Sequence, residues 1–152
     1  MNYLLPLFFL LILFQACSKS NPLPNEKNYQ ANYLAKEALA KIDFQNEELI
    51  SIYMNHHFYY VRQDGKYMQT LTFDNGADPF SDGLARTKIN GKIGFFNTNL
   101  EIVLKPIYDF AFPFHKGVAE ICTGCKEKQA GEHTMLEGGQ WQKINREGLV
   151  IE

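Results

Sequence analysis

The spacing of hydrophobic residues along this chain changes once, near residue 49. Before that point, apolar residues fall at helical spacing, at Ala31, Leu34, Ala35, Ala38, Leu39 and Ile42. A stripe with this period predicts an amphipathic helix of about 15 residues. Asn25 and Asn28 are candidate caps for its first turn. We expect this helix to cover one end of the structure that follows.

From residue 49 on, the pattern becomes that of extended chain. Segments rich in β-branched and aromatic residues, LISIYM, HFYYVRQ and KYMQTLTF, are separated by turn signals. These signals are Asn55-His56, Asp64-Gly65, Asn90-Gly91 and Glu147-Gly148, and we expect a type I′ turn at Asp64-Gly65. The pattern predicts a mainly β fold of antiparallel hairpins, preceded by the short N-terminal helix.

The hairpin segments repeat. FSDGLARTKI at 80–89 returns as FHKGVAEICT at 114–123, an offset of 34, and IGFFNTNLEIV at 93–103 returns as WQKINREGLVI at 141–151, an offset of 48. The difference, 48 − 34 = 14, belongs to an inserted segment that begins CTGCKEKQAGEH. The period predicts repeats at about 58–92 and 93–125, a partial repeat at 141–152, and an inserted loop at 122–140.

Several short motifs recur within the repeat and resemble a known family. They are Phe80 with Gly83-Leu84-Ala85, Gly91-Lys92-Ile93-Gly94, Ile102-Val103, Pro106, Tyr108-Asp109, and Phe114 with Gly117-Val118-Ala119. Over about 58–152 this pattern resembles the WG-repeat (KWG) family of bacterial proteins. The chain departs from it at Ile93, which replaces Trp, at Gln142, which replaces Gly after Trp141, and at Leu100, which replaces Gly. The resemblance implies stacked β-hairpins and no shared catalytic residues.

Elementary physics gives the repeated residues structural roles. Gly83 and Gly117 each follow a polar residue and precede an apolar pair, which predicts a positive φ at a tight turn into a strand. Pro106 lacks an N–H donor, which confines it to a strand start or an edge. The aromatic side chains are expected to fill the space between stacked hairpins. The alternative is an exposed aromatic row suited to stacking on sugars.

The N-terminus reads as a processing segment. Residues 3–14 form an unbroken apolar run, shorter than the ~20 residues of a membrane-spanning helix. The following Phe14-Gln15-Ala16-Cys17 resembles the lipobox of bacterial lipoproteins, which implies a signal peptide at 1–16 and acylation of Cys17. A polar tether at 17–28 and a domain at 29–152 follow. Ser18 implies the outer membrane, facing the periplasm; an uncleaved anchor or an ordinary signal peptide are the alternatives.

The CxxC motif at Cys122-Thr123-Gly124-Cys125 is the candidate chemical site. An even pair of cysteines in an oxidising compartment favours a local disulfide that fixes the start of the inserted loop. A thiol–disulfide exchange site is one alternative. The other is a zinc site built from Cys122, Cys125 and His133, with His56, His57 or His115 as a fourth ligand.

Charge and motif content narrow the function further. Lys and Arg number 15 against 17 Asp and Glu, for a net charge of −2 without a basic stripe, so we expect no nucleic-acid partner. Asp74, Asp82 and Asp109 stand in turn contexts, where such side chains bond their own backbone. No nucleophile or phosphate-binding motif is present, so no cofactor and no catalysis are expected. The sequence predicts an envelope lipoprotein with a binding or structural domain, attached to the membrane by lipid, whose partner is an envelope protein or peptidoglycan.

Overall fold

The computed structural model describes residues 29, 32–131 and 133–151, without the side chains of Ala130 and His133. The predicted signal peptide, the tether, Cys17 and the two candidate helix caps lie outside the described residues. The elements are β1 (Asn32–Tyr33), α1 (Lys36–Leu39), β2 (Leu49–Met54), β3 (His57–Arg62), β4 (Lys66–Thr70), β5 (Thr72–Phe73), β6 (Gly76–Ala77), β7 (Leu84–Ile89), β8 (Lys92–Asn97), β9 (Ile102–Tyr108), β10 (Phe110–Ala111), β11 (Val118–Thr123), β12 (Lys126–Ala130), β13 (His133–Glu137) and β14 (Gln140–Asn145).

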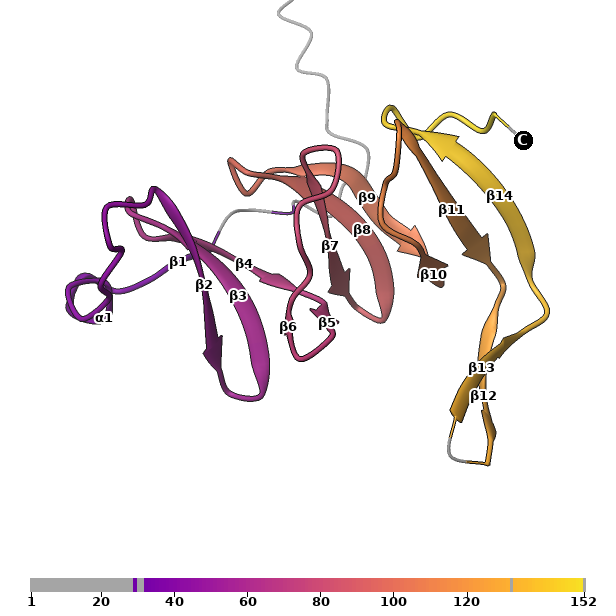
Figure 1. Cartoon of the computed structure of the whole chain (residues 1–152), viewed down its shortest axis with the longest axis horizontal. Helices are drawn as coiled ribbons and strands as arrows, with labels where there is room; N and C mark the ends of the chain where they lie inside the picture. The colour runs from indigo at the N-terminus through magenta and orange to yellow at the C-terminus, as the bar shows by residue number, and fades with distance from the viewer. Residues whose placement is uncertain (1–28, 30–31, 132, 152) are drawn as a thin grey trace, which may run out of the picture.

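Three small antiparallel sheets lie in a row (Figure 1). The N-terminal sheet has the strand order β1-β4-β3-β2, the middle sheet β7-β8-β9 and the C-terminal sheet β10-β11-β14. Two hairpins, β5-β6 and β12-β13, stand outside these sheets. The predicted mainly β fold of antiparallel hairpins with one short helix is confirmed.

The core consists of two apolar layers, one on each face of the middle sheet. Adjacent residues of a strand point to opposite faces. In β8, Phe95 therefore packs toward the C-terminal sheet, against Phe114 with ring centroids 4.8 Å apart. Phe96 packs toward the N-terminal sheet, near Tyr60 and Phe80. The middle sheet is thus buried on both faces, which explains the uninterrupted apolar run in its central strand.

The helix of about 15 residues predicted from the apolar stripe is wrong. The helix α1 contains four residues, and Asn32 and Tyr33 instead form β1. These two residues pair with β4, and the backbone N–H of Leu34 donates to the carbonyl of Gly65 at 2.9 Å. Strand pairing at this sheet edge therefore overrides the helical period. None of the helical structure among the described residues is long and apolar enough to cross a membrane.

The turns follow two designs. Asn55-His56, Asn90-Gly91, Asp82-Gly83 and Lys116-Gly117 have positive φ at both residues, as a type I′ turn requires. The predicted positive φ of Gly83 and Gly117 is confirmed. The predicted type I′ turn at Asp64-Gly65 is wrong, because only Gly65 has a positive φ.

The second turn design recurs once in each sheet. In the N-terminal sheet, the N–H of Gly65 donates to the carbonyl of Arg62. In the middle sheet, the N–H of Leu100 donates to Asn97, and in the C-terminal sheet that of Gly148 donates to Asn145. Leu100 therefore occupies a glycine position, with φ of +56°.

Candidate binding surface on the C-terminal sheet

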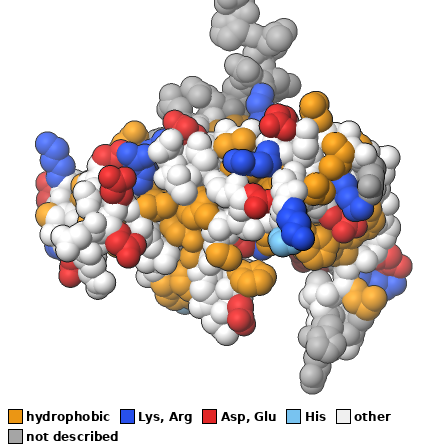
Figure 2. Space-filling model, turned by 45° about the horizontal axis from the view of Figure 1, so that its top comes forward, with side chains coloured by type: hydrophobic (Ala, Val, Ile, Leu, Met, Phe, Trp, Pro, Cys, Tyr) orange, Lys and Arg blue, Asp and Glu red, His pale blue; other side chains and the backbone are white. Residues whose placement is uncertain are grey.

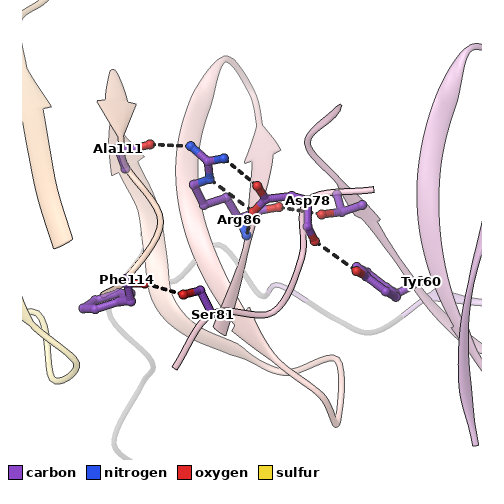
Figure 3. A network of polar contacts seen from close by, with 7 residues as sticks. Tyr60, Asp78, Ser81, Arg86, Ala111 and Phe114 are labelled. Carbon is purple, nitrogen blue, oxygen red and sulfur yellow. Dashed lines mark hydrogen bonds and ion pairs between the residues drawn. The ribbon is translucent and has the colours of Figure 1, made fainter. Parts of the chain in front are cut away.

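A buried polar network fixes the three sheets to one another (Figure 3). The Tyr60 hydroxyl of the N-terminal sheet donates to the carbonyl of Asp78 at 3.0 Å. The Asp78 carboxylate accepts from Arg86 Nη2 at 2.5 Å and from Arg86 Nε at 3.1 Å. Arg86 Nη1 in turn donates to the carbonyl of Ala111, in the C-terminal sheet, at 2.8 Å. The network crosses both core layers.

The bonds of this network stabilise the fold. Asp78 and Arg86 are both buried, and the carboxylate also accepts from the backbone N–H of Arg86 at 2.8 Å. Burial, reinforced by the charge of Asp78, raises the pKa of the Tyr60 hydroxyl above its ordinary value of 10.0. Sequence reasoning missed this pair. Its signal was an arginine two positions after Leu84, on the same face of the predicted strand, since a buried charge requires a partner.

The outer face of the C-terminal sheet carries a different set of side chains. Ala119 and Ile121 of β11 and Ile144 of β14 are buried in the core. The residues between them therefore face outward, and directly opposite residues share a face. Two rows result: Phe110, Cys122 and Trp141, which run across β10, β11 and β14, and beside them the opposed pair Glu120 and Lys143.

Three aromatic rings lie together on this outer face. Phe110 lies 5.0 Å from Phe112 and 6.0 Å from Trp141, measured between ring centroids. Phe112 is 46% exposed and Trp141 39%. Figure 2 shows hydrophobic side chains among acidic and basic ones at the end of the molecule that carries the β12-β13 hairpin. Exposed clusters of aromatic side chains of this kind are typical of interaction sites.

The repeat identifies the part of the middle sheet that corresponds to this outer face. At the offset of 48, Trp141 takes the place of Ile93 and Lys143 that of Phe95. Ile93 and Phe95 are 4% and 0% exposed, because the C-terminal sheet covers them. The outer face of the C-terminal sheet is thus the counterpart of a buried interface between sheets.

The inserted segment begins beneath these rings. Cys122 and Cys125 are joined as a disulfide with Cα atoms 6.0 Å apart, and both cysteines are buried. Gly139 packs against this bridge so closely that a Cβ there would lie 2.6 Å from either sulfur. The predicted inserted loop is in fact the β12-β13 hairpin, closed at its base by the CxxC turn. The oxidation state in the cell stays a prediction, which thiol counting on the unreduced protein tests.

Asp109, which lies between β9 and β10, stabilises the same CxxC turn. Its carboxylate accepts from the N–H of Gly124 at 2.6 Å and from the Lys92 ammonium. The hydrogen bond from Lys92, followed by that from Gly124, lowers the pKa of Asp109 below its ordinary value of 3.8. Asp109 therefore has a structural role, but its carboxylate bonds the backbone of a turn 15 residues away, whereas its sequence context predicts a bond to the backbone of its own turn.

The structure does not assemble the alternative zinc site from the side chains that it describes. Within residues 29, 32–131 and 133–151, no three His, Cys, Asp or Glu side chains gather as metal ligands. The side chain of His133 lies outside the description. His56 and His57 belong to the β2-β3 hairpin of the N-terminal sheet, and His115 precedes β11.

Two shallow grooves lie on the N-terminal sheet, away from this surface. The larger, of about 700 Å³, runs along residues 41–52 beside Tyr60. The smaller, of about 480 Å³, is lined by Tyr53, His56, Phe58, Thr72 and Asn75. Charged side chains of the larger groove are Lys41, Asp43 and Glu47, and the smaller groove contains the imidazole of His56.

The comparisons with known proteins agree with the repeat. Residues 70–92 and 93–124 each match the family model of the WG containing repeat. The boundary between the two matches falls just after the Asn90-Gly91 turn that joins β7 to β8. No curated protein and no solved structure matches the chain. Over residues 70–124 this mainly β chain is thus similar to the WG containing repeat, in two successive copies.

Proposed function

We propose that this protein is a lipoprotein of the bacterial cell envelope whose WG-repeat domain is a non-catalytic binding module. The lipobox-like segment that ends at Cys17 supports lipid attachment. Ser18 favours the outer membrane, on its periplasmic side. The domain then acts at a membrane surface, where two-dimensional confinement raises the effective concentration of a partner.

The single observation that carries the binding role is the outer face of the C-terminal sheet. It carries the exposed rings of Phe112 and Trp141 beside the partly buried Phe110, and Trp141 stands where the repeat elsewhere buries an interface. Several rings side by side on a sheet face suit a protein surface better than a small molecule, which binds in a concave site. Charged residues that could act in catalysis are instead engaged in ion pairs within the chain. Asp78 pairs with Arg86, and Asp109 pairs with Lys92.

Thiol–disulfide exchange is less well supported. An exchanging disulfide must admit an attacking thiolate. Phe110 and Trp141 flank Cys122 on the two neighbouring strands. Gly139 packs against the sulfur atoms of both cysteines, so an attacking thiolate has little access to the bridge. This packing supports a bridge that fixes the base of the β12-β13 hairpin.

Lipid attachment and binding are tested on the full-length chain in its own envelope. Labelled fatty acid is expected to join the wild type and not Cys17→Ala; equal labelling of both contradicts the lipoprotein assignment. A photo-crosslinking amino acid in place of Phe112 is expected to give a discrete covalent product. The same probe in place of Tyr33, which is also exposed but lies on the N-terminal sheet, is the matched control. Equal products from both positions, or none from Phe112, contradict the binding surface.

A further inference from the structure

We propose that the free edge of β2 binds an extended segment of another protein, which adds to the N-terminal sheet as a further strand. This inference goes beyond the proposed function, because the site lies on a different sheet from Phe112 and Trp141. β2 stands at one end of the strand order β1-β4-β3-β2, so only one of its edges is paired. The N-terminal and C-terminal sheets lie at opposite ends of the row, so the two sites are separate (Figure 1).

The register of β2 and β3 defines the backbone groups that the free edge presents. The N–H of Gln63 donates to the carbonyl of Glu48 at 3.1 Å. Hydrogen-bonded pairs alternate with non-bonded pairs along an antiparallel ladder. Ile50 therefore bonds β3, whereas Leu49 and Ser51 direct their N–H and C=O groups away from it. Within the part of the chain that the structure describes, no backbone group pairs with these two residues on that side.

The corresponding edges of the other two sheets are occupied by the chain itself. β7 takes the place of β2 in the middle sheet, because both strands lead through a type I′ turn into the next strand. When these turns are aligned, Arg86 corresponds to Ser51, and its carbonyl accepts from the N–H of Leu71 at 3.1 Å. At the offset of 34, Glu120 of β11 accepts in the same way from the N–H of Phe112 at 2.8 Å. In both sheets, this position of the repeat binds an extended segment.

The chemistry of the free edge selects a polypeptide. The N–H and C=O groups that face one edge of a strand recur at every second residue, and another extended backbone offers complementary groups at the same spacing. Proteins commonly protect free edges with Pro or Lys. The sequence of β2, LISIYM, contains neither. β2 thus lacks two common protections against strand addition.

A groove of about 700 Å³ lies along this edge, between β2 and the loop that precedes it. Ile42 and Phe44 of the loop are half-buried and give the groove an apolar lining. Among its charged side chains, Asp43 and Glu47 outnumber Lys41. We therefore expect the bound segment to carry apolar side chains at alternate positions and a net positive charge.

A proline at one position of β2 tests strand addition on the full-length chain in its own envelope. A photo-crosslinking amino acid replaces Gln45, an exposed residue of the groove, and is expected to give a discrete product that contains a second polypeptide. Ser51→Pro removes an N–H of the free edge but no bond of the β2-β3 ladder. It is expected to reduce the product by about tenfold or more, because a hydrogen bond is lost and the ring obstructs the added strand.

Ser51→Ala keeps the N–H and is the matched control, with an unchanged yield of product. Thermal melting of both Ser51 variants checks that the domain remains folded. A second measurement needs no variant at Ser51: in the purified crosslinked product, amide hydrogen exchange at Ser51 is expected to be slower than in the free protein. Exchange at Ile50, which β3 already protects, is expected to stay the same.

Several results would overturn this inference. They are the absence of a product from position 45, a yield that Ser51→Pro leaves unchanged or that Ser51→Ala lowers equally, and unchanged exchange at Ser51 in the product. A product formed by two copies of this chain would overturn a different protein as the occupant. The probe at Phe112 reports separately on the proposed function, because Ser51→Pro is expected to leave its product unchanged.

Discussion

Gly94 in β8 lies against the backbone of Pro106 in β9. A Cβ on Gly94 would stand 2.7 Å from the Pro106 nitrogen and 2.6 Å from the Leu104 carbonyl oxygen. The contact arises at a β-bulge, where the single Gly94 between Ile93 and Phe95 faces the longer segment between Leu104 and Tyr108. The glycine of the repeat motif is therefore required by the close approach of two strands, and its φ is not in the left-handed region.

This contact predicts that Gly94→Ala destabilises the domain. The obstacle is backbone, which cannot rotate away as a side chain can, so we expect a loss of about 3 kcal/mol in the free energy of unfolding. Gly91→Ala is the matched control, because a Cβ there meets nothing within 4 Å and only the φ of +80° is unfavourable. That control is expected to lose about 1 kcal/mol. Urea unfolding of the full-length chains compares them, and equal losses would refute the close-approach explanation.

At Leu100, backbone strain and core packing have opposite effects on the stability of the domain. Its φ of +56° is unfavourable for leucine, by about 1–2 kcal/mol. Its side chain is 1% exposed and packs in the layer between the N-terminal and middle sheets, where large-to-small changes cost about 2–5 kcal/mol. Packing is the larger of the two effects, so Leu100→Gly is expected to destabilise the domain although it relieves the strain.

Leu100→Ala separates the two effects on Leu100. It loses the packing and keeps the strain, so the expected order of stability is wild type, then Leu100→Gly, then Leu100→Ala. The midpoint of urea unfolding at constant slope measures this order. A Leu100→Gly variant more stable than the wild type would show that strain dominates at this turn.

The Asp78–Arg86 pair is expected to respond more strongly to single changes than to a double one. Asp78→Asn or Arg86→Met leaves a buried charge without its counterion, at a cost of about 3–5 kcal/mol. The double variant Asp78→Asn with Arg86→Met removes both charges and is expected to be more stable than the sum of the single losses predicts. A double-mutant cycle of unfolding free energies measures the difference. Strict additivity would contradict a direct coupling between the two side chains.

The lowered pKa of Asp109 predicts how the stability of the domain changes in acid. The folded-state pKa lies below the ordinary 3.8, so the carboxylate stabilises the fold above that value and loses this contribution as pH falls through the lower, folded pKa. Asp109→Asn is therefore expected to be less stable than the wild type at neutral pH, with a difference that shrinks below about pH 4. Unfolding curves from pH 7 to pH 2 measure it. A difference that is constant over this range would exclude the carboxylate charge as its cause.

The sequence predicts the repeated turns and strands because their causes are local. A type I′ turn at Asn90-Gly91 needs only residues that tolerate positive φ, and Pro106 was confined by its missing N–H to an edge, where β9 lies. The helix failed because its competitor is distant in sequence: β4 offers backbone partners to Asn32 and Tyr33. The Asp78–Arg86 pair and the role of Gly94 also depend on residues brought together only by folding.

The candidate binding surface also depends on residues that are brought together only by folding. Sequence reasoning noted the aromatic residues and the inserted segment but placed no single ring on an outer face. That assignment needs the register in which Phe110, Cys122 and Trp141 form one row. Once the register is known, the offset of 48 identifies Trp141 with the buried Ile93.

The central claim, that the outer face of the C-terminal sheet is a binding surface, is tested most directly at Trp141, which is 39% exposed on that face. A photo-crosslinking amino acid at position 141 of the full-length chain, in its own envelope, is expected to give a discrete covalent product. The same probe at Tyr33, which is 62% exposed on β1 of the N-terminal sheet, is expected to give none. Equal products from both positions, or none from position 141, would contradict the binding surface.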